Sequence, residues 1–327
     1  MKIAVVTETF HPFRGGSAKR YLEVFKRIVK RGHEVDVFTA RLKMDWPLFE
    51  DVYGVRVHRT ETVLVDFITK DGFRSVKGVL RFAGWAFHKL LKDGFDLVEA
   101  NHCPIFPAMA SWLYSKMKHT PLSITFHEAW HRDWYRYVPR SMYAPLGIGL
   151  ERVTTRLPDI AIAVSETTAQ RLAQFFNMSV SIIRVISNGV DLSLFNGFEV
   201  GRDQSKIIYS GRLNPHKKVE WLLVAYSILK HEYPDLKLEI IGDGPSMGQL
   251  AQYMNDSGLK DGVSLRGPVS DLELARSLKS ASIYVHPSIR EGQSITMLEA
   301  MAAGTPQVAV TAAGSAVGEL LAISGSG

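Results

Sequence analysis

Cysteine is nearly absent from this chain, and long apolar runs are missing altogether. The sequence has 327 residues and one cysteine, Cys103, so no intrachain disulfide can form, and we expect Cys103 to serve packing rather than reactivity. No run approaches the roughly 18 apolar residues that a membrane-spanning helix requires. The opening stretch, MKIAVVTETF, is too short for a signal peptide and is typical of a first strand. These absences predict a cytoplasmic protein without a membrane span.

Charge of either sign is moderate, which excludes a disordered chain and argues against a nucleic-acid binder. Hydrophobic residues make up 46% of the sequence and charged residues 22%, so sizeable cores can form. The 39 Lys and Arg against 33 Asp and Glu give a net charge of +6. This mild excess fits a phosphate-rich ligand or a nearby acidic surface, and gives nucleic acid little support. The length suits two domains better than one.

Strand-like and helix-like stretches alternate along the chain in two series. We expect the first strands at Lys2–Thr7, Glu34–Thr39, Val55–Arg59, Leu97–Ala100, Leu122–Phe126, Ile160–Val164 and Ile182–Ile186. The second series is expected at Lys206–Ser210, Lys237–Ile241, Val263–Arg266, Ser282–His286 and Gln307–Val310. Helical patterns lie between most of them, as at Ala18–Arg31, Val76–Lys92, Glu166–Phe176, Val219–His231, Met247–Ser257 and Leu272–Ala281. This alternation predicts an α/β fold with mostly parallel sheets covered on both faces.

The two series meet in a segment with the composition of a linker. Ser187–Ser205 is rich in Gly, Asn, Asp and Ser, and we interpret it as a linker or hinge. We therefore expect an N-terminal domain over residues 1–190 and a C-terminal domain over residues 191–327, with a cleft between them. In such sheets, binding sites lie outside the C-terminal ends of the strands.

The segment Glu291–Glu299, EGQSITMLE, is the most informative in the chain. It follows a strand-like run and leads into a helix expected from Ile295 to Ala303, with Gly292 in the turn between them. Free backbone N–H groups and the helix dipole make such a turn an anion site. Eight helical steps cover about 12 Å, so the two carboxylates are too far apart to act together on one bond. They can instead hold two hydroxyl-rich parts of one long ligand, such as a nucleotide-sugar.

Two loops in the second half carry the signature of a phosphate site. GRLNPHKK, from Gly211 to Lys218, follows a strand and places Arg212 and Lys217 at its end, a pair suited to a diphosphate. A solvated basic turn is the alternative. GDGP, with Gly242 and Gly244, follows the next strand and allows a ligand to approach the backbone closely.

In the first half, Gly15 and Gly16 lie between the first strand and the first helix, where a phosphate loop would lie, although the Gly-x-Gly-x-x-Gly fingerprint is missing. A flexible turn is the other interpretation. His127 ends a predicted strand and would face the cleft, or else serve the structure. With His131 it forms HEAWH, the spacing of zinc proteases. The motif begins directly at a strand end and no third ligand is evident, so a metal site is not expected.

Two segments of the first half combine positive charge with apolar or aromatic residues. A helix over Arg74–Lys92 would carry basic residues on one face, namely Arg74, Lys77, Arg81, His88 and Lys92. WHRDWYRYVPR, over Trp130–Arg140, mixes aromatic residues with arginines. Both suit an interface with anionic lipid. An ordinary surface helix and an acceptor-side loop are the alternatives.

Together these motifs resemble those of retaining glycosyltransferases with the GT-B fold, two Rossmann-like domains whose parallel sheets face a cleft. The group is the "glycosyl transferases group 1" family, which includes phosphatidylinositol mannosyltransferases and sucrose-phosphate synthases. The resemblance covers nearly the whole chain and includes NGVD, from Asn188 to Asp191. The catalytic residues it implies are His127, Arg212, Lys217 and Glu291. The substrate-binding residues it implies are Gly15, Gly16, Asn188, Gly242, Gly244, Gly292, Gln293, Ser294 and Glu299.

The resemblance also implies roles for these residues. Arg212 and Lys217 would bind the leaving diphosphate, Glu291 would hydrogen-bond the donor sugar, and Glu299 would hold the ribose. His127 would contact the transferred sugar near the reacting carbon. The co-substrate would be a UDP- or GDP-linked sugar, from which a hexosyl or N-acetylhexosaminyl group passes to a glycan or a lipid-linked acceptor. No cofactor, metal or nucleic acid would be required. The enzyme would work in the cytoplasm or on the cytoplasmic face of an anionic membrane.

The chain departs from the family pattern in three places. Lys218 replaces a frequent Gly, and Gln293-Ser294 replaces a frequent Phe-Gly. The sequence also ends at SGSG, several dozen residues before the point expected for the family, so we expect the closing helices to be missing and the second domain to be incomplete. A nucleotide-sugar epimerase or phosphorylase of similar fold, and a non-catalytic nucleotide-sugar-binding protein, are the competing hypotheses.

Overall fold

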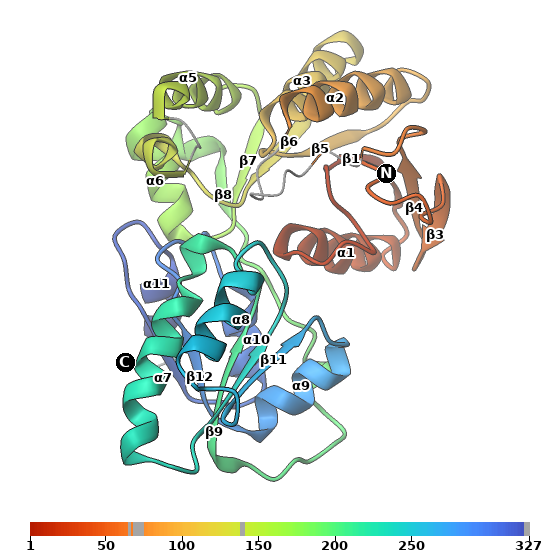
Figure 1. Ribbon diagram of the computed structural model, residues 1–327. Helices are drawn as coiled ribbons and strands as arrows, with labels where there is room; N and C mark the ends of the chain where they lie inside the picture. The colour runs from red at the N-terminus through yellow and green to blue at the C-terminus, as the bar shows by residue number, and fades with distance from the viewer. Residues whose placement is uncertain (65–66, 68–74, 138–140, 324–327) are drawn as a thin grey trace. The chain divides into compact units, whose positions relative to one another are not determined.

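The computed structural model describes residues 1–64, 67, 75–137 and 141–323 (Figure 1). The chain divides into two compact units, Met1–Ser187 and Asn188–Gly327, each built on its own sheet. The division falls after Ser187, whereas the sequence pattern placed it at residue 190. Among the described residues, no helix is long and apolar enough to cross a membrane.

The first unit is built on an eight-stranded sheet with the order β3-β4-β2-β1-β5-β6-β7-β8. Its strands are β1 (Lys2–Val6), β2 (Glu34–Thr39), β3 (Phe49–Val52), β4 (Val55–Arg59), β5 (Leu97–Asn101), β6 (Leu122–Phe126), β7 (Ile160–Ala163) and β8 (Ile183–Val185). Neighbouring strands are parallel, except for the antiparallel pair β3 and β4. The sequence pattern missed β3 because FEDV is a short edge strand, with two acidic residues and only one buried residue.

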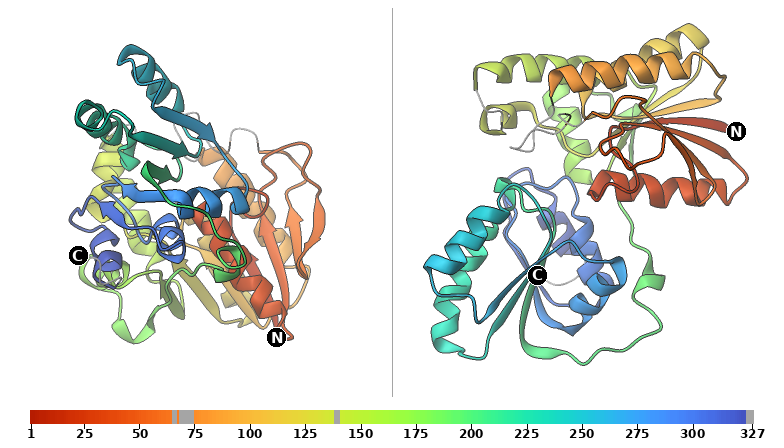
Figure 2. Two further views of the ribbon diagram at one scale, coloured as in Figure 1. Left: turned by 90° about the horizontal axis from the view of Figure 1, so that it is seen from below. Right: turned by 45° about the vertical axis from the view of Figure 1, so that its right-hand side comes forward.

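Helices cover both faces of this sheet (Figure 2). They are α1 (Gly16–Val29), α2 (Val76–Leu90), α3 (Ile105–Lys118), the short α4 (Trp134–Tyr137), α5 (Ala144–Thr154) and α6 (Glu166–Phe176). Alternate residues of β1 serve opposite faces: Ile3 and Val5 pack with α1, whereas Ala4 and Val6 pack with the α2 and α3 side. A strand buried on both faces is apolar at nearly every position, which is why the strands were recognisable in the sequence.

The second unit is built on a parallel five-stranded sheet with the order β11-β10-β9-β12-β13. The strands are β9 (Asp203–Ser210), β10 (Lys237–Ile241), β11 (Val263–Gly267), β12 (Ala281–His286) and β13 (Gln307–Ala309). The helices are α7 (Val219–Glu232), α8 (Met247–Asp256), α9 (Asp271–Ser280), α10 (Ile295–Ala302) and α11 (Val317–Ile323). The segment predicted to be a linker is only partly one, because Phe195 is 4% exposed and belongs to the core of this unit.

In both sheets, the first strand lies inside the sheet and the strand order reverses beside it. In the first unit β1 lies between β2 and β5, and in the second unit β9 lies between β10 and β12. Ligands of open α/β sheets bind outside the carboxyl ends of the strands at such a reversal. We therefore expect ligand-binding residues in the loops that follow β1 and β5 in the first unit, and in those that follow β9 and β12 in the second.

Candidate active site

Two glycine-containing loops of the second unit interlock through their backbones. The loop after β9 and the loop after β10 are joined by hydrogen bonds from Leu213 N to Asp243 O (2.9 Å) and from Ser246 N to Leu213 O (2.9 Å). A Cβ on Gly242, whose φ is +144°, would lie 1.9 Å from the carbonyl oxygen of Gly211. A Cβ on Gly244 would lie 2.6 Å from that of Leu213. Both predicted binding glycines are thus required for packing of the two loops.

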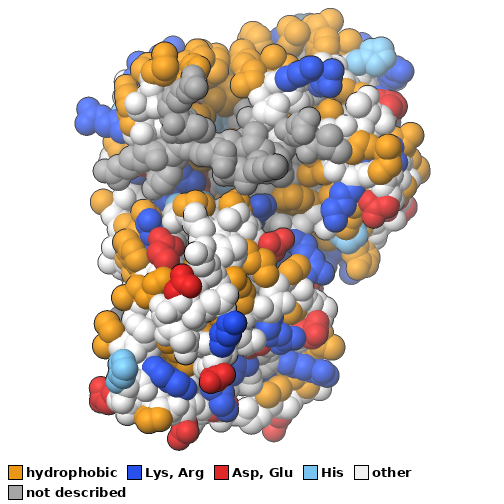
Figure 3. Space-filling view, viewed as in Figure 1, with side chains coloured by type: hydrophobic (Ala, Val, Ile, Leu, Met, Phe, Trp, Pro, Cys, Tyr) orange, Lys and Arg blue, Asp and Glu red, His pale blue; other side chains and the backbone are white. Residues whose placement is uncertain are grey.

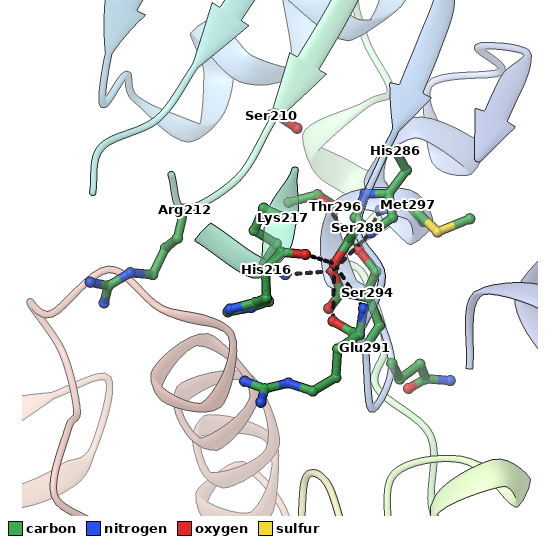
Figure 4. Close-up of polar contacts among 12 residues, drawn as sticks. Ser210, Arg212, His216, Lys217, His286, Ser288, Glu291, Ser294, Thr296 and Met297 are labelled. Carbon is green, nitrogen blue, oxygen red and sulfur yellow. Dashed lines mark hydrogen bonds and ion pairs between the residues drawn. The ribbon is translucent and has the colours of Figure 1, made fainter. Parts of the chain in front are cut away.

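The loop after β9 ends in a short 3-10 turn, Pro215–Lys217, which leads into α7. Lys218, the residue before α7, has a φ of +52°, the left-handed conformation that glycine adopts at lower cost. This geometry would favour Gly at that position. Lys217 forms an ion pair with Glu291, so the structure brings these two predicted residues together. Arg212 comes from the same loop, but Figure 4 shows its side chain pointing away from Glu291.

Glu291 lies in the loop between β12 and α10 and is 8% exposed. Its Oε1 contacts both the ammonium of Lys217 and, at 2.8 Å, Nε2 of His286 (Figure 4). Burial alone would raise the pKa of the Glu291 carboxyl, but the charge of Lys217 and the hydrogen bond from His286 outweigh it and hold the pKa well below its usual range. The site therefore contains an ionised, paired carboxylate at neutral pH.

The remaining predicted residues of this unit surround the start of α10. Ser294 precedes α10 and accepts a hydrogen bond from Met297 N (3.4 Å), and Gly292 is buried in the same loop. Asn188 Nδ2 donates to the backbone oxygen of Gln293 (3.2 Å). Glu299 lies within α10 and is 3% exposed. The 12 Å separation expected between the two glutamates does not apply, because α10 begins at Ile295 and Glu291 is not helical.

In the first unit, the predicted glycine loop leads directly into α1. Gly15 precedes the helix in an extended conformation with a φ of −171°, and Gly16 is the first helical residue. The residue that precedes the helix, Gly15, provides no side-chain hydrogen bond to this helix start. The N–H groups of the first turn have no partners within a helix, so this end of α1 suits an anion.

His127 directly follows β6 and packs edge-on against Tyr21 of α1, with ring centroids 5.9 Å apart. Its Nε2 is buried and has no hydrogen-bond partner among the described residues. Burial, with the nearby charges of Arg20 and His102, lowers the pKa of His127 to about 3. His127 is therefore a neutral imidazole at neutral pH.

Sequence reasoning missed a second histidine of the same kind. His102 follows β5, is 5% exposed, and its Nε2 also lacks a partner in the described part of the chain. Burial lowers the pKa of His102 to about 4. Beside it, Asn101 Nδ2 donates to Glu8 Oε2 (2.9 Å), and both residues are buried. The rule that singled out His127, a polar residue at the end of a buried strand, would have found His102 and Asn101 as well.

The HEAWH segment leads from the end of β6 into a 3-10 turn. His131 lies in a 3-10 turn and stacks on Phe175, with ring centroids 4.8 Å apart. Among the described residues, no group of three or more His, Cys, Asp or Glu side chains could hold a metal ion. A different partner fixes this loop: the buried carboxylate of Glu151 accepts hydrogen bonds from Trp130 N (2.8 Å), His131 N (2.9 Å) and Trp134 Nε1 (2.8 Å).

Cys103 and the basic residues of α2 both lie at the surface of the first unit. Cys103 is exposed, so the prediction that it serves packing was wrong. It follows the end of β5, and the chain there turns into α3 rather than into the core. The basic face of α2 is exposed, as expected, at Lys77, Arg81 and His88, while Arg74 lies outside the described residues. Residues 138–140 of the aromatic loop also lie outside them.

Solved structures share this architecture. Sucrose-phosphate synthase from Thermosynechococcus elongatus superposes with a TM-score of 0.79 at 20% identity, covering 94% of this chain and 80% of that one. HepE from Anabaena, solved in complex with UDP-glucose, gives a TM-score of 0.69 at 18% identity, over 96% of this chain and 81% of that one. The two Rossmann-like units, each with polar loops at its strand-order reversal, thus form the α/β architecture of GT-B glycosyltransferases.

The sequence comparisons identify the family. Residues 14–194 match the profile described as Glycosyltransferase Family 4, and residues 204–324 match Glycosyl transferases group 1. The chain is 26% identical to the alpha-monoglucosyldiacylglycerol synthase of Streptococcus pneumoniae, over 94% of this chain and 71% of that protein. The chain belongs to glycosyltransferase family 4 and is a glycosyltransferase.

Proposed function

We propose that this enzyme transfers a hexosyl group from a nucleotide-diphosphate sugar, UDP- or GDP-linked, to a glycan or lipid-linked acceptor with retention of anomeric configuration. The observation that carries the proposal is the ion pair of Lys217 and Glu291 at the strand-order reversal of the second unit. A cation for phosphate and a carboxylate for sugar hydroxyls lie there side by side. A structural relative was solved with UDP-glucose bound, which supports this class of donor.

The second unit, assigned to residues 191–327, would hold the donor. Lys217 and Arg212 would bind the diphosphate and stabilise the charge that develops on it as the glycosidic bond breaks. Donor binding would exchange partners: Lys217 passes from the carboxylate to the phosphate, and Glu291 accepts hydrogen bonds from sugar hydroxyls. The start of α10, at Gly292, Gln293 and Ser294, offers N–H groups to phosphate oxygens. Glu299 would hold the ribose.

The first unit, assigned to residues 1–190, would present the acceptor. The start of α1 at Gly15 and Gly16 would approach the donor phosphate or the acceptor. The neutral imidazole of His127 has a buried nitrogen suited to one hydrogen bond from or to a sugar hydroxyl near the reacting carbon. Retention then follows if the acceptor attacks on the face that the diphosphate leaves, with a phosphate oxygen taking the acceptor proton. This chemistry requires no cofactor.

A lipid-linked acceptor at the cytoplasmic membrane face is supported by the surface of α2 and α3. These helices lie side by side, and Figure 3 shows hydrophobic and basic side chains together over this part of the unit. Leu80 of α2 and Met117 of α3 are 49% and 55% exposed, and the basic residues Lys77 and Arg81 of α2 are exposed as well. Apolar side chains framed by positive charge suit an anionic bilayer surface. Co-sedimentation with anionic vesicles at low salt tests this, and failure to bind would count against it.

The donor proposal is tested by measuring transfer and nucleotide release with UDP- and GDP-sugars. We expect one donor to be turned over, and the matching nucleotide diphosphate at 100 times its Kd to stabilise the fold by about 2.7 kcal/mol. Glu291→Ala and Lys217→Ala should each abolish transfer while the protein stays folded. Lys237→Ala is the matched control, because Lys237 forms an exposed pair with Asp203 and has no place in the proposed site. Binding without transfer would favour a non-catalytic protein, and donor turnover without an acceptor would favour an epimerase.

A further inference from the structure

We infer that His286 is a positioning residue that holds the Glu291 carboxylate in the orientation required by the donor sugar, through a buried hydrogen-bond chain that includes Tyr284 and Thr296. The inference rests on the proposed function, in which Glu291 contacts the sugar. It adds residues that the sequence motifs do not include.

The imidazole of His286 is fixed at both ring nitrogens. His286 is the last residue of β12 and is 1% exposed. Its Nε2 lies 2.8 Å from Glu291 Oε1, and its Nδ1 lies 3.1 Å from the hydroxyl of Tyr284. Rotation of the ring would break both contacts in a buried place, where an unpaired polar group costs about 1–3 kcal/mol. The ring therefore offers Glu291 a donor in one fixed direction.

The chain continues from the strand to the helix that follows it. The hydroxyl of Tyr284 lies 2.8 Å from Thr296 Oγ1 and 3.2 Å from the backbone oxygen of Ser210, the last residue of β9. Thr296 Oγ1 in turn lies 3.1 Å from Ser294 Oγ at the start of α10. The hydrogen-bond chain thereby connects the Glu291 carboxylate with the first residues of α10.

The direction of the hydrogen bonds follows from the partners. Glu291 is ionised and can only accept, so His286 must carry a proton on Nε2. In a neutral ring Nδ1 is then an acceptor, to which the Tyr284 hydroxyl can donate as an alternative to the backbone oxygen of Ser210. Tyr284 keeps its proton, because burial raises its pKa above the usual value. The phenol oxygen can in turn accept a hydrogen bond from the Thr296 hydroxyl.

Donor binding makes His286 more important than it is in the free enzyme. Lys217 and His286 both contact Oε1 of Glu291, so among the contacts of the described residues Oε2 is left for a sugar hydroxyl. When a diphosphate draws Lys217 away, His286 is the contact that still holds Oε1. Loss of His286 should thus affect the sugar much more than the nucleotide.

Side-chain length provides a sharp test. A Gln at position 286 can place an N–H near the position of Nε2, an Asn reaches only to the position of Nδ1, and a Leu offers no donor. We expect His286→Leu and His286→Asn to lower kcat/KM for the nucleotide-sugar by about 10- to 100-fold, the effect of one hydrogen bond to a charged group, and His286→Gln to recover most of it. The Kd of the nucleotide diphosphate without sugar should stay within about twofold of wild type.

The outcomes separate this inference from the proposal on which it rests. If wild type turns over no nucleotide-sugar, the proposed function fails. If wild type transfers sugar and Glu291→Ala does not, but His286→Leu keeps full kcat/KM, the positioning role is wrong. The inference would also be overturned if the affinity for the nucleotide diphosphate fell as much as kcat/KM in His286→Leu. It would likewise be overturned if kcat/KM of His286→Gln did not exceed that of His286→Leu. Should His286→Leu fail to fold, Tyr284→Phe decides: a selective loss with the nucleotide-sugar supports the chain, and unchanged kinetics contradict it.

Discussion

The two units place buried histidines at equivalent ends of their sheets, but in opposite states of hydrogen bonding. In the second unit both ring nitrogens of His286 have partners, and its neighbour Glu291 is paired with Lys217. In the first unit Nε2 of His127 and of His102 have none within the described ranges. A buried polar atom without a partner costs free energy that a ligand can recover. The second unit thus holds its buried histidine by its own contacts, whereas the first unit leaves buried imidazole nitrogens without a partner in the described part of the chain.

The largest expected effect comes from breaking the ion pair of the second unit. Lys217→Met leaves a buried carboxylate without its cation, and we expect the free energy of unfolding to fall by about 3 kcal/mol. The double variant Lys217→Met/Glu291→Gln should recover at least half of that loss, because the unpaired charge is gone. Urea unfolding of the variants measures this, with the exposed pair partner Lys237→Met as a control. A double variant that loses the sum of the single losses would contradict the pairing.

The second largest effect is expected from substituting a glycine of the second unit, Gly242, and it should exceed that of substituting a glycine of the first unit, Gly15. Gly242→Ala forces a Cβ to within 1.9 Å of a backbone oxygen at a φ of +144°, so we expect a loss of about 2–3 kcal/mol and weaker nucleotide binding. Gly15→Ala places a side chain on extended backbone beside the Phe13 ring and should cost less than about 1 kcal/mol. Thermal unfolding with and without nucleotide compares the two. Equal losses would show that the interlocked loops do not set the difference.

The neutral histidines of the first unit should make it sensitive to acid. Their pKa values in the folded state are about 3 for His127 and about 4 for His102, below the usual value of 6.5, so the unfolded chain takes up protons first as the pH falls. The two neutral histidines therefore contribute their full share to the free energy of unfolding above pH 6.5. As the pH falls from 6.5 towards the pKa values in the folded state, each histidine lowers the free energy of unfolding by about 1.4 kcal/mol per pH unit.

Tryptophan fluorescence during urea unfolding can follow this loss, because of the six tryptophans only Trp221 lies in the second unit. His127→Gln should flatten the dependence on pH between 6.5 and 4.5. The exposed His88→Gln serves as the control and should leave the slope unchanged. An unaltered slope for His127→Gln would show that His127 is not held neutral.

The smallest expected effect concerns Lys218, which has a φ of +52°. Lys218→Gly removes the left-handed strain at the cost of backbone entropy, so we expect a gain of about 0.5 kcal/mol. Lys218→Ala keeps the strain and should show no gain, which makes it the matched control. Thermal unfolding distinguishes them, and a gain in both variants would assign the effect to the lost charge instead.

Much of the architecture was predictable because it depends on local patterns. The strands other than β3, several helices such as α1, α7 and α10, and the loops carrying Lys217 and Glu291 were recognised from residue order. The strand order was not, because pairing between distant segments leaves little trace in the local sequence. Without that order, nothing marked the end of β5 as a reversal point, and His102 and Asn101 passed unnoticed. His286 was assigned to a strand, but its contact with Glu291 depends on how the following loop folds back.

The interlock of the two glycine loops limits how the substrate preference of this enzyme can change. The contact is made by backbone groups of Gly211, Leu213 and Asp243, with Gly242 and Gly244 leaving room for it. Substitution of the neighbouring side chains therefore leaves the framework of the loops intact. New donor preferences could therefore arise around a fixed frame, one side chain at a time, whereas any side chain at Gly242 or Gly244 would force the two loops apart.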